Sequence, residues 1–247
     1  MSTSSNDSLD GQRALVTGAT SGIGRAVAFK LAQEGAEVIV HGRDAARGAE
    51  TVNEIIEAGG TASFVAADLG ETAEVQRLAD DVGDVDILIN NAGISVFGPT
   101  AEFEVSAFDR MFASNVRAPF ILVAALAPGM AARGRGSIVS LSSMAGGVGI
   151  VGGAAYGATK VALEAMTRAW AAEYSASAVR VNAIAPGPVY TPTPSGAEFI
   201  TALGETTPMH RASQPEEIAE VIAFLASPRA SYITGTTVAA DGGRRAI

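Results

Sequence analysis

Short apolar runs alternate with longer amphipathic stretches along the chain from Arg13 onward. The runs read RALVTG, EVIVHG, ASFVAAD, VDILIN, SIVSLSS, VRVNAIAPG and TTVAAD. Short runs rich in β-branched residues predict strands, and the amphipathic stretches between them predict helices. Because the runs are apolar throughout, each strand is expected to be covered on both faces, as in a parallel sheet with helices on either side.

The alternation predicts an α/β fold with a doubly wound, seven-stranded parallel sheet, since right-handed crossovers place helices on both faces of the sheet. A chain of 247 residues fits one domain, which we place at residues 10–247. Helices are expected up to Glu34, from Asp44, from Glu71, over 104–131 and over 154–175.

Two segments depart from this rhythm. Residues 1–9 are polar and are predicted to form a disordered tail. Five prolines lie between positions 186 and 208, just past the sixth predicted strand. Ligands bind beyond the carboxyl ends of the strands in such sheets, so residues around 190–212 are predicted to form a substrate lid.

Composition narrows the possible functions. With 48% hydrophobic and 17% charged residues the chain is expected to be globular, and its net charge of -9 disfavours nucleic acid as a partner. No run of eighteen apolar residues and no apolar leader occurs, so we expect a cytoplasmic protein without a membrane partner. The absence of cysteine and the wide separation of His41 and His210 argue against a metal site. Chemistry must then use hydroxyls, carboxylates, amides, lysine or a bound organic cofactor.

A glycine-rich segment joins the first predicted strand to the first predicted helix. It reads TGATSGIG over residues 17–24, with the glycines spaced GxxxGxG rather than GxGxxG. Small residues let the backbone approach a pyrophosphate, and the N–H groups and dipole of the following helix stabilise its charge. From this segment alone, an ordinary glycine-rich turn remains the alternative.

Three motifs in order give the chain a family resemblance. TGATSGIG is followed by Asn90-Asn91-Ala92-Gly93, by a serine, and by Tyr156-Gly157-Ala158-Thr159-Lys160. This order, which spans nearly the whole chain, resembles the short-chain dehydrogenase/reductase family. The resemblance implies a Rossmann-type fold and an NAD(P)-dependent oxidoreductase acting on CH–OH groups of a small-molecule substrate. The family includes 3-oxoacyl-(acyl carrier protein) reductases and related carbonyl reductases.

The resemblance also implies which residues contact the cofactor. The glycine loop would hold the pyrophosphate, the segment after the third strand would meet adenine, and the segment after the sixth strand would receive the nicotinamide carboxamide. The implied contacts are Gly18, Thr20, Ser21, Gly22, Ile23, Gly24, Arg43, Asp68, Leu69, Asn91, Ala92, Gly93, Tyr156, Lys160, Pro186, Gly187, Val189 and Thr191.

The end of the second predicted strand bears on the choice between NADP(H) and NAD(H). An acidic residue there binds the ribose 2′-OH, whereas a basic one pairs with a 2′-phosphate. The chain has Gly42 at the acid position and Arg43 next to it, which favours NADP(H) and leaves NAD(H) as the alternative. Asp44 either contacts the ribose or caps the following helix, and capping is favoured because Asp before a helical run is a strong N-cap.

Tyr156 is the candidate general acid/base, since hydride transfer to a carbonyl leaves an oxygen that must gain a proton. A phenol is a weak base, but Lys160 lies four residues later on the same helical face. At about 4 Å and an effective dielectric of about 20 its charge is worth roughly 4 kcal/mol, or about three pKa units. We therefore expect the phenol to titrate at about pH 7.

Two further residues complete the catalytic set that the resemblance implies. Ser143 lies thirteen residues before Tyr156 and is expected to hydrogen-bond the substrate oxygen. Strand alternation places the neighbouring Ser142 on the opposite face. Asn115 resembles the family's helix-interrupting asparagine, which holds a water in a relay toward Lys160. Asn115 is also interpretable as a mid-helix polar residue bonded to backbone, which is compatible with that role.

The substrate is left open by these motifs. Residues 144–155 read MAGGVGIVGGAA, and their large groups, with those of Val96, Phe97, Tyr190 and Met209, predict an apolar pocket. Five glycines in that segment have no explanation in the sequence. Docking of an acidic carrier protein would need a basic surface, for which Arg133 and Arg135 are candidates that the net charge opposes.

Three readings follow. The first is an NADP(H)-dependent reductase of ketones or 3-oxoacyl substrates, the second an NAD(H)-dependent alcohol dehydrogenase of the same family, and the third a non-catalytic, dinucleotide-binding regulatory protein. The resemblance implies a homotetramer assembled through the helices at 104–131 and 154–175.

Overall fold

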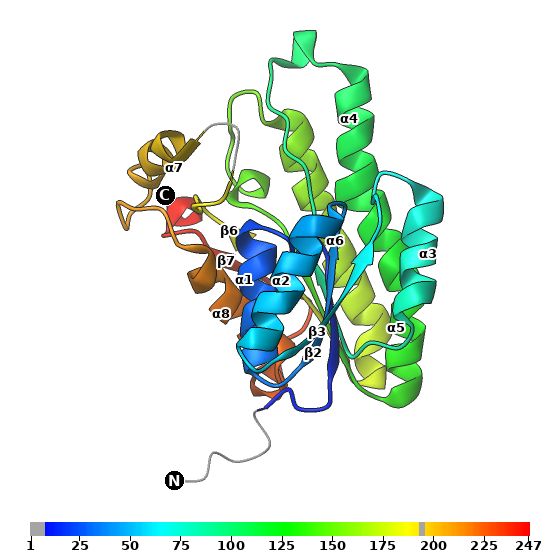
Figure 1. The fold of residues 1–247 in the computed structure, drawn as a ribbon. Helices are drawn as coiled ribbons and strands as arrows, with labels where there is room; N and C mark the ends of the chain where they lie inside the picture. The colour runs from blue at the N-terminus through cyan, green and yellow to red at the C-terminus, as the bar shows by residue number, and fades with distance from the viewer. Residues whose placement is uncertain (1–7, 193–195) are drawn as a thin grey trace.

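The computed structural model describes residues 8–192 and 196–247 and contains one parallel sheet (Figure 1). The strands follow the order β3-β2-β1-β4-β5-β6-β7. They are β1 (Arg13–Val16), β2 (Glu37–Gly42), β3 (Thr61–Ala66), β4 (Ile87–Asn90), β5 (Gly136–Leu141), β6 (Val179–Pro186) and β7 (Thr237–Ala240). The predicted seven-stranded, doubly wound parallel sheet of a Rossmann-type single domain is confirmed. All strands are parallel, and the direction in which successive strands are added to the sheet reverses between β1 and β4.

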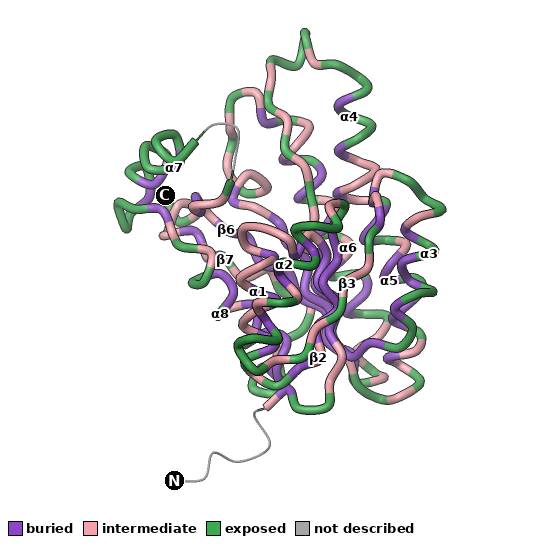
Figure 2. The backbone as a smooth tube through the Cα atoms, in the orientation of Figure 1, coloured by how far each residue is buried: buried purple, intermediate pink, exposed green. Residues whose placement is uncertain are grey.

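Helices cover both faces of the sheet (Figures 1 and 2). They are α1 (Gly22–Gln33), α2 (Ala45–Glu57), α3 (Thr72–Val82), α4 (Val105–Phe112), α5 (Ala118–Arg133), α6 (Ala154–Tyr174), α7 (Gly196–Gly204) and α8 (Pro215–Ala226). Alternate residues of one strand serve opposite layers. Val16 packs in the core with α1, α2 and α8, whereas Leu15 packs in the core with α3, α5 and α6. This two-sided burial explains why the strands read as apolar runs.

The helix expected over 104–131 is interrupted. A π-helical turn at Ala113–Arg117 separates α4 from α5, and Asn115 lies at its centre with its side chain fully buried. The whole stretch Val105–Arg133 is long and apolar enough to cross a membrane by length and composition, a test that the core helices of globular proteins also pass. Leu122, Val123 and Met130 of α5 are completely buried against the sheet, as expected of a core helix.

The chain packs against the domain earlier than expected. Leu9 is completely buried among residues of α1 and the sheet, and its N–H donates to the carbonyl of Glu34 at 2.8 Å. The prediction of a disordered tail over 1–9 is therefore wrong at its end, because one apolar side chain in the polar segment anchors it. Residues 1–7 lie outside the described residues.

The proposed lid contains a helix that was not predicted, because the segment is rich in proline. α7 lies beyond the carboxyl ends of β6 and β7, near the C-terminus (Figure 1), and Phe199 on it is 54% exposed. On either side of the lid, Val189 pairs with Ser213 in an isolated parallel bridge. The lid at 190–212 stays a prediction, and residues 193–195 within it lie outside the described part of the chain.

Candidate active site

The predicted site residues meet at the carboxyl edge of the sheet. The glycine loop follows β1, Arg43 follows β2, Asp68 follows β3, Asn91 follows β4 and Ser143 follows β5. Because the strand order reverses between β1 and β4, the loops there diverge to opposite faces and leave a crevice. The glycine loop and the Asn91 segment line this crevice.

The glycine loop fits a pyrophosphate. Gly18 and Gly22 have φ values of +65° and +52°, which glycine adopts without strain. A Cβ on Gly24 would overlap the carbonyl oxygen of Gly18, so α1 approaches β1 more closely than any other residue permits. Ser21 at the start of α1 makes no side-chain cap hydrogen bond within the described structure, so it leaves the first-turn N–H groups to an anion.

The segment after β4 supports this loop through Thr17. The Thr17 hydroxyl accepts hydrogen bonds from the N–H groups of Asn91 and Ala92, both at 3.0 Å. The Asn91 side-chain amide donates in return to the carbonyls of Thr17 at 2.8 Å and Gly18 at 3.2 Å. Gly93 continues toward the catalytic group, where a Cβ on it would lie 3.5 Å from Lys160 Nζ.

His41 is a site residue that sequence reasoning missed. Its ring is buried, Nδ1 accepts from the N–H of Gly18 at 3.2 Å, and Nε2 lies 3.1 Å from the carbonyl of Ala67. These partners need the neutral ring with its proton on Nε2. Burial lowers the pKa of His41 to about 4. The signal available in the sequence was a single histidine within the apolar run 37–42.

The adenosine end of the crevice is polar. Arg43 is exposed, and Thr20 lies against Gly42, where a Cβ would come within 3.1 Å of the Thr20 hydroxyl. Asp44 accepts from the N–H of Ala46 at 3.0 Å and of Arg47 at 3.1 Å, and these hydrogen bonds lower the pKa of its carboxyl. The interpretation of Asp44 as an N-cap is confirmed. Arg43 is therefore the charged residue at the end of β2 that is left to contact a ribose.

The segment after β3 is organised around Asp68. Its carboxylate accepts from the N–H of Gly70 at 2.8 Å, and its own N–H donates to Glu74 at 2.6 Å. Leu69 is 5% exposed and packs in the core, so a cofactor could contact it through its backbone. Ile23, at the opposite side of the crevice, is partly buried against the core on the α1 side.

The two candidate hydroxyls come together. The Ser143 hydroxyl accepts from the N–H of Ala145 at 3.2 Å and lies beside the Tyr156 phenol. Burial raises the pKa of Tyr156, and the neighbouring Ser143 hydroxyl offsets part of that increase. Ser142 points to the opposite side, as strand alternation predicts, and donates to Glu164 on α6 at 2.6 Å.

Lys160 corrects one expectation. Its buried Nζ donates to the carbonyl of Leu141 at 2.7 Å and lies 5.6 Å from the centre of the Tyr156 ring. Burial lowers the pKa of Lys160 to about 8. The prediction that this lysine brings the phenol to neutral pH is wrong for the protein alone, where the pKa of Tyr156 is raised. Desolvation of the phenol dominates, and the ammonium is directed toward a backbone carbonyl.

Asn115 fixes the backbone beside the lysine. Its side-chain oxygen accepts from the N–H of Ile94 at 2.9 Å, and its amide donates to the Ile94 carbonyl at 2.8 Å and the Thr159 hydroxyl at 3.1 Å. The side chain is thus bonded mainly to backbone, as the second interpretation expected, and the relay role that the resemblance implies stays a prediction. It aligns the 91–94 segment with α6 and places Gly93 beside Lys160.

The nicotinamide segment encloses the crevice from the far side. Pro186 ends β6, and Gly187 lies so close to Asp241 that a Cβ would stand 2.7 Å from its Cα. Val189 is buried, and Thr191 reaches the glycine loop, where a Cβ on Gly22 would lie 3.0 Å from its methyl group. The segment after β6 therefore faces the loop after β1 across the predicted cofactor site.

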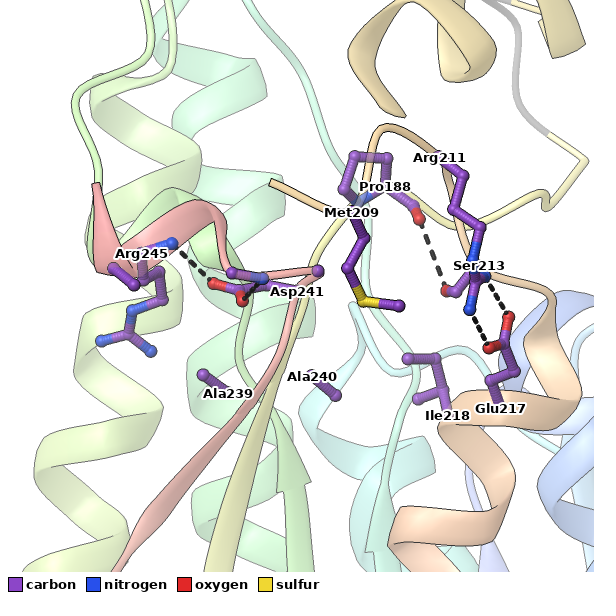
Figure 3. A pocket seen from close by; sticks show the side chains of 13 residues that line it. Pro188, Met209, Arg211, Ser213, Glu217, Ile218, Ala239, Ala240, Asp241 and Arg245 are labelled. Atoms are coloured by element: carbon purple, nitrogen blue, oxygen red, sulfur yellow. Dashed lines mark hydrogen bonds and ion pairs between the residues drawn. The ribbon is translucent and has the colours of Figure 1, made fainter. Parts of the chain in front are cut away.

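Apolar groups surround the hydroxyls. Phe97 lies with its ring centre 5.4 Å from that of Tyr156 and is half exposed, as a pocket wall requires. Met209 and Pro188 line a cavity of about 600 Å³ at the end of β7, with Arg245 at its border (Figure 3). Arg245 also packs against Gly147, so this cavity adjoins the turn that follows Ser143. The residues that line the cavity do not include Ser143 or Tyr156.

Two predicted surface residues lie elsewhere. Arg133 ends α5 and pairs with Asp84, and Arg135 pairs with Asp86 at 3.0 Å. Both precede β5 and lie at the amino edge of the sheet, opposite the edge that carries Ser143. Their suggested role in docking a carrier protein at the active site is wrong, because the strand length separates them from it.

Comparisons with known proteins agree with this geometry. Residues 18–245 match the family model described as enoyl-(acyl carrier protein) reductase. Cis-4-hydroxycyclohexanecarboxylate dehydrogenase of Sinomonas cyclohexanicum is 38% identical over 242 residues, which cover 95% of this chain and 96% of that one. A solved short-chain dehydrogenase/reductase family protein shares 49% identity with a TM-score of 0.90, over 97% of this chain and 99% of that chain.

Two similar structures contain cofactors. A gluconate 5-dehydrogenase from Burkholderia cenocepacia, in complex with NADP and tartrate, is 32% identical with a TM-score of 0.90 over 97% of each chain. A 7α-hydroxysteroid dehydrogenase bound to NADH and 7-oxo glycochenodeoxycholic acid is 34% identical with a TM-score of 0.92 over 98% of each chain.

A dinucleotide-dependent oxidoreductase with a Rossmann fold accounts for both the crevice and these likenesses. More specifically, the chain belongs to the short-chain dehydrogenase/reductase family, whose members act on CH–OH groups with NAD(P).

Proposed function

We propose that this protein is an NADP(H)-dependent oxidoreductase that transfers a hydride between nicotinamide and a ketone or 3-oxoacyl carbonyl, or the corresponding secondary alcohol, with Tyr156 as general acid/base. The proximity of the Ser143 hydroxyl to the Tyr156 phenol carries this proposal. Two neighbouring hydroxyls can both reach a single substrate oxygen, which is the geometry that protonation of a developing alkoxide needs.

In the reducing direction Tyr156 donates its proton to the substrate oxygen. Burial raises the pKa of the phenol, so the proton is present at neutral pH. Ser143 donates a hydrogen bond to the same oxygen and stabilises the charge that develops on it. The bound cofactor supplies or accepts the hydride and, in its oxidised form, contributes a positive charge.

In the oxidising direction Tyr156 must lose its proton before it accepts one from the alcohol. The neighbouring Ser143 hydroxyl lowers the pKa of Tyr156 and so favours the ionised phenol. Lys160, which is mainly protonated at pH 7 given its pKa of about 8, places a cation 5.6 Å from the ring centre. Asn115 holds the segment that packs against this lysine. The Ser143 hydroxyl and the Lys160 cation therefore both favour the ionised phenol, whereas burial disfavours it.

The mechanism is tested by NADPH oxidation across a panel of ketones and 3-oxoacyl thioesters. Tyr156→Phe removes the transferable proton and should lower kcat by at least about a hundredfold, with NADPH affinity retained. Turnover unaffected by this substitution would contradict the role of Tyr156. Tight NADPH binding without turnover of any panel member would instead support a regulatory dinucleotide-binding protein.

The choice of NADP(H) rests on Arg43, the exposed base at the end of β2. Arg43→Ala should weaken NADPH binding about tenfold and leave NADH within about twofold, because only NADPH carries the 2′-phosphate. Fluorescence titration measures both affinities. Arg47→Ala is the matched control, since Arg47 is exposed nearby but pairs with Asp44. Equal losses for both cofactors would refute the 2′-phosphate contact and favour the NAD(H)-dependent alternative.

A further inference from the structure

The C-terminal segment is fixed in place by a buried aspartate. Asp241 follows β7, is 5% exposed, and accepts hydrogen bonds from the N–H groups of Gly243 and Arg245, both at 2.9 Å (Figure 3). These two bonds set the direction of the short helical turn Arg244–Ala246. The Arg245 backbone is thereby held at the border of the cavity at the end of β7.

The Arg245 side chain reaches the turn that follows Ser143. A Cβ on Gly147 would overlap its Nε and stand 2.7 Å from its Cζ, so the guanidinium lies directly on the face of that glycine. Gly146 similarly leaves room for Glu164, whose carboxylate would be 3.3 Å from a Cβ there. Two of the unexplained glycines are thus places where an ion pair packs against the backbone.

The partner of Arg245 is a buried carboxylate. Glu164 lies on α6 one turn after Lys160, its side chain is 11% exposed, and its Oε1 is 3.6 Å from Arg245 Nη1. The same oxygen accepts the Ser142 hydroxyl at 2.6 Å. Within the described residues Arg245 is the cation paired with Glu164, while Lys160 directs its Nζ to the carbonyl of Leu141.

Removing one member of a buried pair leaves an uncompensated charge, which is costly. Without Arg245 the Glu164 carboxylate would lose its paired cation and move toward water, and this movement alters the acceptor for Ser142. Because Ser142 and Ser143 are adjacent, the position of the catalytic hydroxyl depends on that acceptor. Even a small displacement of the Ser143 hydroxyl slows a reaction that requires the hydroxyls of Ser143 and Tyr156 to be aligned.

We propose that Arg245 is a positioning residue, whose ion pair with Glu164 holds Ser142 and the 144–147 turn so that Ser143 meets Tyr156 and the substrate oxygen. The kinetic part of this inference rests on the proposed function. The positional part concerns the turn itself, and it can be measured without turnover.

The kinetic test compares Arg245→Met, Arg245→Lys and Arg244→Met with the wild-type enzyme, using NADPH and the ketone turned over fastest in the panel. Arg245→Met should lower kcat about tenfold and change the KM for NADPH by less than about twofold. Arg245→Lys should recover most of the loss because it restores the cation. Arg244→Met, a neighbour without an ion pair among the described residues, should match the wild type.

The positional test uses hydrogen exchange in the protein with NADPH bound. The amides of Ala145, Gly146 and Gly147 donate to the hydroxyl of Ser143, the carbonyl of Ser143 and the carbonyl of Met144, respectively. Arg245→Met should accelerate their exchange about tenfold, and Arg244→Met should not. Gly147→Ala, which displaces the guanidinium while keeping its charge, should give the same pattern as Arg245→Met.

Unchanged exchange and kcat in Arg245→Met would overturn the proposal, as would a loss confined to the KM for NADPH or one that lysine fails to restore. Faster exchange with no turnover in any variant, wild type included, would sustain the positional role while the proposed function fails. Tyr156→Phe separates the two in the other direction, since it should abolish turnover and leave the exchange of this turn unchanged.

Discussion

Burial sets the ionisation of three side chains around the crevice. The pKa of His41 falls to about 4 and that of Lys160 to about 8, while that of Tyr156 rises. In each case loss of hydration disfavours the charged form. The protein alone therefore moves each of these groups toward neutrality, and His41 serves as a neutral acceptor for the backbone of the glycine loop.

Protonation of His41 makes stability depend on pH. The unfolded chain binds this proton at about pH 6.5, whereas the native ring binds it at about pH 4. Between these values the unfolded state holds more protons, so the free energy of unfolding decreases as pH falls from 6.5 to 4, by about 3 kcal/mol from this group. Urea unfolding at pH 7 and pH 4 measures the change.

The variant His41→Gln should show a smaller decrease over the same range, because it has no ring to titrate. His210→Gln is the matched control, because it removes the other imidazole of the chain at an exposed position. An identical pH dependence in His41→Gln and the wild type would show that folding does not change the proton affinity of this ring, contrary to its burial.

At the scale of elements, the close approach of α1 to β1 shapes the glycine loop. The helix begins at Gly22, and Gly24 faces the carbonyl of Gly18 with no space for a methyl group. The interruption between α4 and α5 is a second such feature, because the buried Asn115 ties that turn to the segment after β4. Both features bring elements together through backbone contacts rather than through apolar side chains.

Gly24→Ala should separate α1 from β1. We expect a loss of about 1–3 kcal/mol in the free energy of unfolding, as for other overpacked sites, together with weaker NADPH binding. Chemical denaturation and cofactor titration measure the two effects. Gly149→Ala is the control, because a Cβ there meets open space in the described structure. Equal stability of both variants would contradict the close contact.

At the scale of the whole molecule, apolar side chains are exposed on the helices expected to join subunits. Val105 and Phe108 of α4, Phe120 of α5 and Val161 of α6 are between 39% and 72% exposed. Single exposed apolar residues are ordinary, but several on adjoining helices indicate an interface. We propose that these helices pair in a homotetramer.

Light scattering should give a mass about four times that of the 25.0 kDa chain. Phe120→Glu places a charge in the proposed interface and should yield dimers or monomers with unchanged secondary structure. Ile56→Glu on α2, where Ile56 is also half exposed, should leave the mass unchanged. A monomeric wild-type protein, or a Phe120→Glu variant of unaltered mass, would disprove this interface.

The strands and most helices were predictable because their signals are local. The run EVIVHG forms β2 with the same boundaries. A short apolar segment rich in β-branched residues is typical of a strand that is buried on both faces of a sheet. Leu9 and α7 were missed because each is a short exception within a polar or proline-rich segment. The candidate residues of the active site were nameable from their motifs, whereas their contacts were not.

The sequence by itself determined the parallel sheet, the glycine loop and the order of the catalytic motifs, because periodicity and glycine requirements act between neighbours along the chain. Tertiary structure alone decided that the pKa of Tyr156 rises, that Arg133 lies at the wrong edge of the sheet, and that Gly147 makes room for Arg245. Each of these depends on burial or on contact between segments that are distant in sequence, and no local pattern encodes such a distance.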